Sequence, residues 1–216
     1  MKTQNNKSSK SIIELFKTLF FAGFIAILFR SFLFEPFNIP SGSMKPNLLV
    51  GDFLFVSKWS YGFSRHSLPF SIPLIPGKIF SKLPNRGDVV VFKTPENNRT
   101  DYIKRVIGLP GDTIQFVDGE IFLNKEPINR KKITIVQNVR CGASNFEVDA
   151  YEETLDNGVS YTAVYNKSGT LKNTDIYIVP ENHFFFLGDN RDCSKDSRFL
   201  SSVGYVDRLN LVGKAQ

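Results

Sequence analysis

Apolar residues form one long run near the start of the chain. From Thr18 to Phe29 the sequence reads TLFFAGFIAILF, which carries no charge, and Lys17 and Arg30 flank it. A helix needs about 20 residues to cross the roughly 30 Å hydrocarbon core of a bilayer. Residues 15–34 supply that length if the two flanking basic side chains extend toward the interfaces. The pattern therefore predicts one transmembrane anchor over residues 15–34.

A cleaved secretory signal peptide is the alternative interpretation of this run. Such a signal needs a small-residue cleavage site soon after its apolar core. The sequence that follows is RSFLFEPFNIP, which is bulky and lacks two small residues in A-x-A spacing. We therefore interpret the run as an uncleaved anchor. Lysines precede it, so the positive-inside rule places residues 1–14 in the cytoplasm and residues 35–216 outside it.

Beyond the anchor, apolar residues occur in short runs separated by Gly, Pro, Asn and Asp, which is typical of strands. The segment TIQFVDGEIFL predicts a hairpin, because Asp118-Gly119 can take the positive φ angles of a tight turn. No amphipathic helix of four turns stands out, so the body is predicted to be all-β. The predicted strands are 53–57, 88–93, 102–107, 113–117, 120–123, 133–139, 159–165, 176–179 and 183–187.

Two stretches of the body are predicted to be loops or insertions. Residues 61–86 contain four prolines among apolar residues, which disfavours a central strand. This loop could rest on the lipid surface or pack over the core, and the sequence leaves both open. Residues 140–172 mix charge with glycine and are predicted to form an excursion on the far side of the domain.

Charge is concentrated near the N-terminus. The chain has 27 basic and 21 acidic residues, a net charge of +6. Residues 1–35 carry five basic and two acidic residues, a net charge of +3, so half of the excess lies on this short arm. The body has no dense basic stripe and no nucleic-acid-binding motif, which argues against a nucleic acid partner.

The cysteines and histidines do not form a metal-ligand pattern. Cys141 and Cys193 are far apart, and neither has metal-ligand spacing with His66 or His183. We therefore expect no zinc site. In an extracytoplasmic domain the two cysteines could form a disulfide bond, but their separation in sequence does not decide this.

Three short segments contain residue types that often build active sites. They are residues 40–46 (PSGSMKP), 101–112 (DYIKRVIGLPGD) and 188–198 (GDNRDCSKDSR). Taken alone, the first segment could be a linker between membrane and domain, because Ser-Gly loops are common connectors. The combination of the three segments is much more specific.

Together these segments resemble type I signal peptidases, the membrane-bound serine proteases that remove signal peptides from exported proteins. The similarity extends to residues 37–52 (FNIPSGSMKPNLLVGD), 87–92 (GDVVVF) and 211–215 (LVGKA). The order and rough spacing of these motifs agree with that family, while residues 61–86 and 140–172 are not matched. The resemblance implies an all-β domain with a coiled β-sheet, carried by one N-terminal transmembrane helix.

The resemblance implies that Ser43 is the nucleophile and that Lys104 is its general base. A serine hydroxyl needs a base to take its proton, and the usual base is histidine. Both histidines lie outside the three segments, since His66 is in the proline-rich loop and His183 begins an apolar run. A lysine can replace histidine only when it is neutral, and burial lowers its pKa from about 10.4.

The family likeness also assigns supporting residues. The hydroxyl of Ser194 is expected to orient the lysine amine, and Ser41 with the Ser43 backbone N–H is expected to stabilise the oxyanion. Strand alternation predicts that at most one of Lys104 and Arg105 is buried, and the resemblance gives Lys104 the inward position. It also pairs Arg105 with Asp189, and Asp196 with Arg198.

Signal peptidases prefer small side chains at the first and third positions before the cut, and the family builds these pockets from apolar residues. The matching positions are Phe37, Ile39, Pro40, Met44, Leu48, Val91, Tyr102 and Ile103. Most of them would be core residues in any β domain. An extended substrate is expected to pair with strand edges near Ser41 and Lys104.

Two positions depart from the family pattern. Asn47 stands where relatives usually have Thr, and Cys193 stands where many have Asn before the orienting serine. Neither residue has a required catalytic role in the expected mechanism. Cys193 could confer sensitivity to thiol reagents, although a buried inert thiol is the simpler expectation.

The implied partners are preproteins that carry signal peptides, together with the lipid bilayer. We expect a monomer in the plasma (inner) membrane, with an extracytoplasmic catalytic domain over residues 35–216. No metal or organic cofactor is implied, because a dyad and oxyanion donors suffice for acyl transfer.

Three alternative functions remain open on the sequence. A self-cleaving Ser/Lys protease of the SOS-repressor kind would share the dyad, but would carry a DNA-binding domain in place of an anchor. A specialised relative could process one dedicated substrate, such as a conjugation pilus subunit. A membrane-tethered β domain could instead bind peptides or scaffold an envelope complex, with Ser43 and Lys104 inert.

Overall fold

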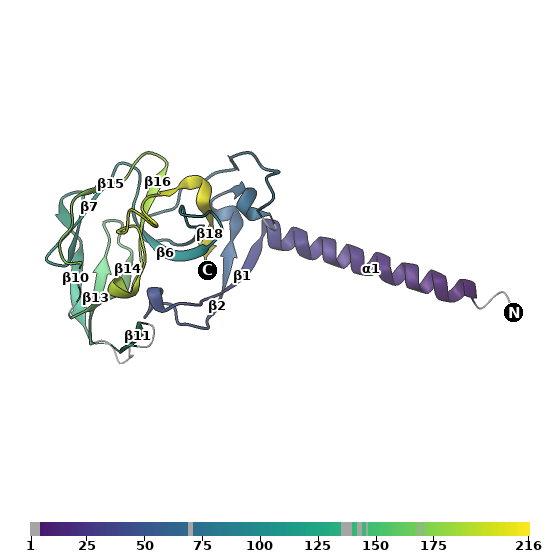
Figure 1. Ribbon diagram of the computed structural model, residues 1–216, viewed down its shortest axis with the longest axis horizontal. Coiled ribbons are helices and arrows are strands. Elements are labelled where there is room, and N and C mark those ends of the chain that lie inside the picture. The colour runs from purple at the N-terminus through teal and green to yellow at the C-terminus, as the bar shows by residue number, and fades with distance from the viewer. Residues whose placement is uncertain are drawn as a thin grey trace.

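A long N-terminal helix projects from a β-rich body (Figure 1). The computed structural model describes residues 5–68, 71–134, 140–141, 144–145, 147–167, 169 and 171–216. Helix α1 (Asn5–Phe32) projects from the body, and its apolar segment Ile12–Phe32 has a mean hydropathy of 2.1 and is exposed except near its end, where Ser31 is buried. By length and composition this segment can cross a membrane.

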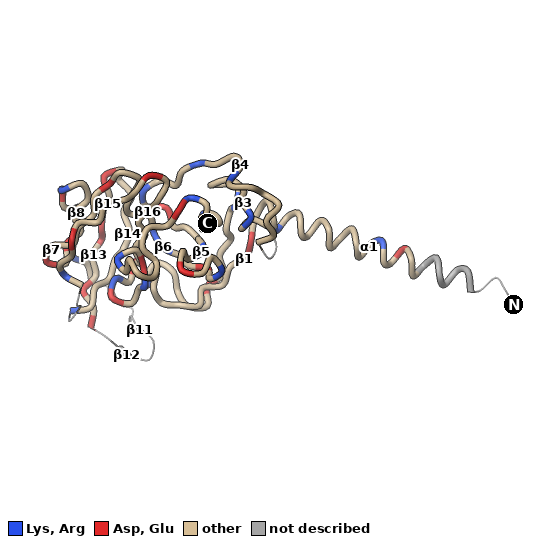
Figure 2. The backbone as a smooth tube through the Cα atoms, turned by 45° about the horizontal axis from the view of Figure 1, so that its top comes forward, with Lys and Arg blue, Asp and Glu red and all other residues tan. Residues whose placement is uncertain are grey.

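The junction between helix and body is abrupt. The helix ends at Phe32, and strand β1 (Phe34–Asn38) begins two residues later. The last residues of the predicted anchor, 33–34, therefore lie outside the helix, and Phe34 belongs to the sheet. Figure 2 shows a long uncharged stretch of α1 before the chain enters the body.

The main sheet has seven strands, all joined by antiparallel pairs, and the last strand of the chain lies inside it. Because this C-terminal strand pairs with both the second and the fifth strand, it ties the two halves of the sheet together. In spatial order the strands are β1, β2 (Phe53–Ser57), β18 (Leu211–Ala215), β5 (Val89–Lys93), β6 (Asp101–Gly108), β16 (His183–Leu187) and β17 (Val206–Asp207).

Two smaller sheets complete the end of the body away from α1 (Figure 1). One has the order β15 (Tyr177–Ile178), β7 (Thr113–Val117), β8 (Glu120–Leu123) and β9 (Glu126–Pro127). The other has the order β10 (Asn129–Ile133), β13 (Val148–Thr154) and β14 (Ser160–Asn166). Two short hairpins are formed by β3 (Phe63–Ser64) with β4 (Lys78–Ile79) and by β11 (Arg140–Cys141) with β12 (Ser144–Asn145).

The prediction of an all-β body is confirmed. Outside α1, the helices in the described part of the chain are single 3₁₀ turns of three residues. The hairpin between β7 and β8 has the predicted register, with Val117 opposite Glu120. Asp118 and Gly119 form its turn with φ angles of 48° and 79°, so both adopt the left-handed conformation that the sequence favoured.

The strand predicted over 133–139 falls mostly on residues 135–139, which lie outside the described part, and β10 ends at Ile133. Residues 140–172, which were expected to form an excursion, contain β13 and β14, and β14 matches the strand predicted over 159–165. Charged residues occupy both faces of β13, including a buried glutamate, and this concealed the alternation that identifies a strand.

The proline-rich loop, residues 61–86, lies beside the end of α1 (Figure 2). The ring of Phe32 packs edge-on against that of Phe63, with centroids 5.3 Å apart. The first part of the loop packs over the body, while Leu74 and Phe80 are strongly exposed, and contact of the loop with lipid stays a prediction. Its apolar tip therefore lies on the side of the body where α1 leaves it.

A buried ion pair fixes β13 and β14 to the segment that follows β16. Glu153 on β13 accepts hydrogen bonds from both Arg191 NH groups, at 2.7 and 3.0 Å, and both side chains are fully buried. The hydroxyls of Tyr161 and Tyr165 donate to the same carboxylate, at 2.8 and 2.5 Å. Arg191 also donates to the carbonyl of Gly188 at 3.1 Å. The carboxylate is thus satisfied on both oxygens.

We predict that Glu153→Ala lowers the free energy of unfolding by about 3–5 kcal/mol, because it leaves the Arg191 charge buried without a partner. Denaturant unfolding of the full chain in detergent measures this change. The matched control is Glu147→Ala, which breaks the surface pair with Lys167 and should leave the unfolding midpoint unchanged. Equal midpoints for the two variants would contradict the structural role of the buried pair.

Candidate active site

Ser43 lies on a tight turn between the first two strands. Ser41 is in extended conformation and precedes the 3₁₀ turn Gly42–Met44. The fully buried side chain of Met44 fixes this turn in the apolar core, so the neighbouring Ser43 is only 6% exposed. A flexible linker would not hold a serine in this way. The interpretation of residues 40–46 as a linker is therefore wrong.

Lys104 reaches Ser43 from the middle of β6. The strand pairs with β5, where Val90 is opposite Lys104. The amine Nζ lies 2.7 Å from Ser43 Oγ and donates to the carbonyl of Ile103 at 2.9 Å. The side chain is 4% exposed. The structure therefore brings together the two residues that the resemblance assigned to the dyad, although they are 61 positions apart.

The surroundings of Lys104 favour its neutral form. Burial lowers the pKa of the amine from 10.5 to about 8, while the charges of Asp196 and Asp189 act in the opposite direction. Desolvation penalises the ammonium more than these carboxylates stabilise it. A pKa near 8 leaves a usable fraction of neutral amine close to neutral pH, as a general base requires.

The two remaining predicted serines have different positions. Ser41 Oγ lies 3.3 Å from Ser43 Oγ, so its hydroxyl is beside the nucleophile. Ser194 is buried near the same turn, but its hydroxyl has no hydrogen-bond partner among the described residues. Its predicted contact with the lysine amine is not formed in this structure, and the orienting role of Ser194 stays a prediction.

Arg105 is buried together with Lys104, which corrects the expectation that only one of them would be. Arg105 is 7% exposed and forms a bidentate pair with Asp189, at 2.8 and 2.7 Å. The alternation of β6 is regular, but both of its faces are covered. Ile107 packs into one apolar cluster and Val106 into another. The ring of Tyr161 lies over the Arg105 guanidinium, 4.2 Å away.

A second ion pair lies next to the dyad. Arg198 Nε donates to Asp196 at 2.8 Å, and Asp196 also accepts from the backbone N–H of Gly188 at 3.0 Å. Burial alone would raise the pKa of Asp196, but the Arg198 charge and hydrogen bond lower it. Asp196 therefore stays ionised and holds the segment that carries Ser194.

Gly188 permits a close approach between this segment and the nucleophile. A Cβ atom at this position would lie 2.6 Å from the carbonyl oxygen of Ser43 and would collide with the Ser194 side chain. Real Cβ atoms do not approach a backbone oxygen this closely. Glycine is therefore required here by space.

Two asparagines support the turn in ways that the sequence did not suggest. Asn190 donates from its backbone to the carbonyl of Ser43 at 3.0 Å and from its side chain to that of Gly42 at 3.1 Å. Asn47 donates to Asp189 and to the carbonyl of Thr162, both at 2.7 Å. Asn190 lies inside the quoted segment 188–198, which was the available signal. Asn47 was noticed only as a departure from the family pattern.

Most residues expected to bind the substrate lie in one apolar cluster beside Ser43. Tyr102 packs instead with a second cluster, its ring centroid 5.1 Å from Lys104 Nζ, and Pro40 is exposed. The cluster also contains the strand residues Leu54, Val56 and Val212. The expected residues within it are Phe37, Ile39, Met44, Leu48, Val91 and Ile103.

The described residues contain no group of three or more His, Cys, Asp or Glu side chains that could hold a metal ion. Neither His66 nor His183 contacts the dyad in the described hydrogen bonds, since His66 bonds to Ser71 and His183 to the carbonyl of Glu181. Cys193 is disulfide-bonded, so it offers no free thiol beside the site. The side chain of Cys141 lies outside the described part of the chain.

Comparison with known proteins shows which family the chain belongs to. The sequence model of the family described as "Signal peptidase, peptidase S26" matches residues 12–216. The chain belongs to this family. It is 40% identical over 225 residues to signal peptidase I of Rickettsia typhi, covering 100% of this chain and 83% of that protein. It is 41% identical over 229 residues to signal peptidase I of Rickettsia conorii, with the same coverage.

A solved structure of signal peptidase I from Enterococcus faecalis is 27% identical, with a TM-score of 0.36, and the match covers 62% of this chain and 97% of that one. Family membership confirms the resemblance stated from the motifs and shows a serine peptidase. Together with the apolar helix α1, it indicates an inner-membrane protein.

We predict that replacing Lys104 by Met stabilises the fold at pH 7, because the buried amine no longer has to be desolvated in its charged form. Between pH about 8 and 10.5 the unfolded chain keeps a proton on Lys104 that the folded chain has lost. The free energy of unfolding of the wild type should therefore rise with pH in this window relative to that of Lys104→Met.

Denaturant unfolding at pH 7 and pH 10 measures both effects. Lys172→Met, at an exposed position, serves as the control and should show no such pH-dependent difference. A difference between wild type and Lys104→Met that is the same at both pH values would show that the amine has an ordinary pKa.

We predict that Gly188→Ala reduces peptidase activity by about a hundredfold or more, because the new methyl group displaces the Ser43 turn from the lysine amine. Steady-state turnover of purified full-length enzyme measures this loss. Gly23→Ala is the matched control, since a Cβ at Gly23 meets open space. Full activity of folded Gly188→Ala would show that the close contact is not needed.

Proposed function

We propose that this chain is a signal peptidase I that cleaves N-terminal signal peptides from exported preproteins after small residues. Ser43 acts as the nucleophile and neutral Lys104 as the general base. The observation that carries the proposal is the 2.7 Å approach of the two buried groups, Ser43 Oγ and Lys104 Nζ. Family membership supports the peptidase activity, and the lowered pKa of Lys104 supports its role as the base.

In the acylation step, Lys104 Nζ takes the proton of the Ser43 hydroxyl as Oγ attacks the scissile carbonyl carbon. The carbonyl of Ile103 holds one N–H of the amine, which leaves the lone pair directed toward the serine. The resulting oxyanion accepts hydrogen bonds from the Ser43 backbone N–H and the Ser41 hydroxyl. Collapse of this intermediate breaks the peptide bond, and the lysine ammonium gives its proton to the leaving amine.

The second half of the reaction reverses these roles. The signal peptide remains bound to Ser43 as an ester, and the mature protein leaves with a free N-terminus. Lys104 then takes a proton from water, the hydroxide attacks the ester carbonyl, and Ser43 Oγ leaves and is reprotonated by the lysine. No atom outside the chain, substrate and water is needed.

The sheet offers an edge for an extended substrate. β1 is at the end of the seven-stranded sheet, so its outer side is open for pairing among the described strands. β16 pairs with β6 from Arg105 onward, which leaves the β6 residues before Arg105 without a partner on that side among the described strands. A peptide strand between these two edges would pass the Ser43 turn, in the β-augmentation mode.

The apolar cluster beside Ser43 accounts for the preference for small residues. Met44 and Ile39 are almost fully buried, and Ile103 closes the cluster next to Lys104. A substrate side chain entering beside these groups has little free volume, so alanine fits and larger residues do not. We assign the shallow pockets of the first and third positions before the cut to this cluster.

The chain orientation follows from charge and from the junction of helix and sheet. Lys2, Lys7 and Lys10 precede the apolar segment Ile12–Phe32, and by the positive-inside rule they support a cytoplasmic N-terminus with the β body on the opposite side. Ser43 follows the end of α1 at Phe32 by eleven residues, so the nucleophile remains close to the membrane surface. Signal peptides present their cleavage sites at this surface.

The test is cleavage of a preprotein that carries an A-x-A site, with the new N-terminus identified by mass spectrometry. Wild-type enzyme in detergent should cut after the second alanine, while folded Ser43→Ala and Lys104→Met should be inactive. The value of kcat/KM should rise with pH through about 8, because only the neutral amine can take the serine proton.

Arg99→Ala is the control for a nonspecific loss of peptidase activity and should cleave as the wild type does, because this exposed residue lies outside the dyad and its supporting ion pairs. Activity in folded Lys104→Met would mean that another group is the base. A folded wild type that cuts no preprotein would instead favour a dedicated substrate or a peptide-binding role.

A further inference from the structure

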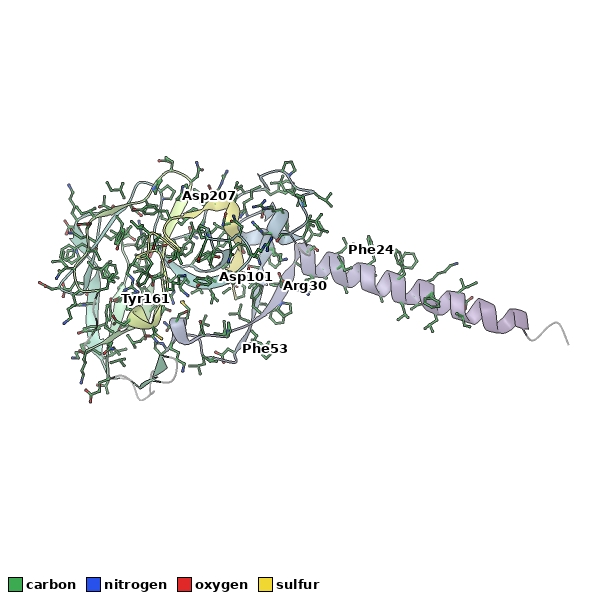
Figure 3. The ribbon with its side chains drawn as sticks, viewed as in Figure 1. Phe24, Arg30, Phe53, Asp101, Tyr161 and Asp207 are labelled. Carbon is green, nitrogen blue, oxygen red and sulfur yellow. The ribbon has the colours of Figure 1, made fainter. Side chains whose placement is uncertain are left out.

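A small charged cavity lies where α1 enters the body. Its volume is about 210 Å³, below the roughly 300–1,000 Å³ of sites for drug-sized molecules. Arg30 and Ser31 from the last turn of α1 contribute to its wall, as does Asp101 from β6. Figure 3 labels Arg30 at the end of α1 and Asp101 in the adjoining part of the body. The cavity is separate from the dyad, because neither Ser43 nor Lys104 lines it.

The cavity carries one more positive than negative charge. Its basic residues are Arg30, Lys58 and Lys93, and its acidic residues are Glu35 and Asp101. Burial lowers the pKa of His66, which also lines the cavity, to about 4, with a further contribution from nearby Arg65, Lys93 and Lys78. The imidazole is therefore neutral at physiological pH, and a net charge of +1 remains in the wall.

Each cation keeps hydrogen-bond donors that the protein does not use in the described contacts. Arg30 has five N–H donors and directs two of its nitrogens at Glu35, at 3.0 and 2.6 Å. Lys58 contacts Glu35 at 2.9 Å and donates to the carbonyl of Ser67 at 2.8 Å. Each ammonium has three N–H groups, so one remains on Lys58.

The same count leaves a donor on Lys93. Its amine contacts Asp101 at 2.7 Å and donates to the carbonyl of Arg99 at 3.0 Å. The carboxylates thus neutralise part of the positive charge and position the three cations. They leave at least one N–H donor on each cation without a partner in the described contacts.

Ser31 supplies an independent observation that points to a ligand. Its side chain is buried, with 1% of the residue exposed, and its Oγ has no hydrogen-bond partner among the described residues. A serine inside a helix normally bonds to a backbone carbonyl of the preceding turn or to water. An unpaired buried hydroxyl costs free energy, so a group that accepts its hydrogen bond is expected in the cavity.

The location indicates the source of that group. Ser31 and Arg30 lie at the end of the membrane-spanning segment Ile12–Phe32, where lipid phosphates are found. Phe34 and Trp59 pack edge-on beside the junction, with ring centroids 4.5 Å apart, and aromatic side chains of this kind mark the membrane interface.

We propose that this cavity binds the phosphodiester of a membrane phospholipid, held by Arg30, Lys58, Lys93 and the Ser31 hydroxyl. The single negative charge of a phosphodiester balances the +1 of the wall. The acyl chains of the lipid leave the cavity along the exposed apolar side chains of α1. This binding site is independent of the proposed peptidase mechanism, because no catalytic group takes part in it.

The experiment titrates the full chain in neutral detergent with short-chain phosphatidylglycerol, and follows the emission of Trp59. This is the only tryptophan of the chain and it adjoins Lys58. Saturable binding is expected for the wild type. Ser31→Ala should weaken it about tenfold or more, the effect of losing one hydrogen bond to a charged group. Its thermal midpoint without lipid should be equal or higher, because no protein partner is lost.

Matched variants distinguish lipid binding in this cavity from nonspecific lipid binding to the protein surface. Lys93→Gln should weaken binding, whereas Lys82→Gln and Ser201→Ala, at exposed positions that do not line the cavity, should bind as the wild type does. Equal affinity of Ser31→Ala and wild type would overturn the proposal. Equal affinity for short-chain diacylglycerol, which lacks phosphate, would also overturn it.

A competition experiment with inorganic phosphate distinguishes a lipid phosphodiester from free phosphate as the bound group. If it competes only weakly with the lipid, the lipid assignment stands. If it binds as tightly as phosphatidylglycerol and is equally sensitive to Ser31→Ala, the cavity is a free-phosphate site and the lipid assignment is wrong.

Discussion

The amine of Lys104 must be buried and still lie within a hydrogen bond of Ser43, and much of the surrounding structure follows from this requirement. Desolvation lowers its pKa, but four charged residues lie close by. They are arranged as two ion pairs, Arg105 with Asp189 and Arg198 with Asp196. Each carboxylate already has a guanidinium partner. Neither carboxylate therefore stabilises the protonated form of Lys104 enough to offset its burial. The base can then be neutral near pH 8.

The same pairs connect elements that are distant in sequence. Asp189 is bound by Arg105 on β6 and by Asn47 from the turn that carries the nucleophile. Glu153 on β13 is bound to Arg191, only two residues after Asp189. The segment after β16 is thus held from three directions, and Gly188 lets it lie directly against the Ser43 carbonyl. One network of ion pairs and hydrogen bonds therefore fixes the position of the Ser43 turn and the charges around Lys104.

Local sequence patterns predicted those elements whose conformation depends on neighbouring residues in the chain. The hairpin at Asp118-Gly119 followed from turn residues, and β16 followed from a short apolar run. The strand β13 could not be found in this way, because Glu153 points inward and is stabilised by Arg191 from a distant segment. The burial of Arg105 was missed for the same reason, since alternation describes one strand and not what covers its two faces.

The dyad and its two neighbouring ion pairs were predicted from motifs and the family resemblance. The asparagine contacts that support the Ser43 turn were not predicted. Ser43 and Lys104 could be named because their segments resemble a family whose membership the comparisons show. The contacts of Asn47 and Asn190 depend on how three segments meet, which no single segment encodes. Ser31 is a further case, since an unpaired hydroxyl is visible only once its surroundings are known.

The short distance along the chain from membrane to nucleophile joins the two proposed sites. Glu35 on β1 forms ion pairs with Arg30 of α1 and with Lys58, which follows β2. These two ion pairs stabilise the junction between helix and sheet. Burial would raise the pKa of Glu35, but its hydrogen bonds to Lys58 and Arg30 lower it, and the carboxylate stays ionised. A lipid phosphate bound here would fix the height of β1 above the bilayer. Since β1 leads directly into the Ser43 turn and offers the open edge for the substrate, the same contact would set where the enzyme meets the signal peptide.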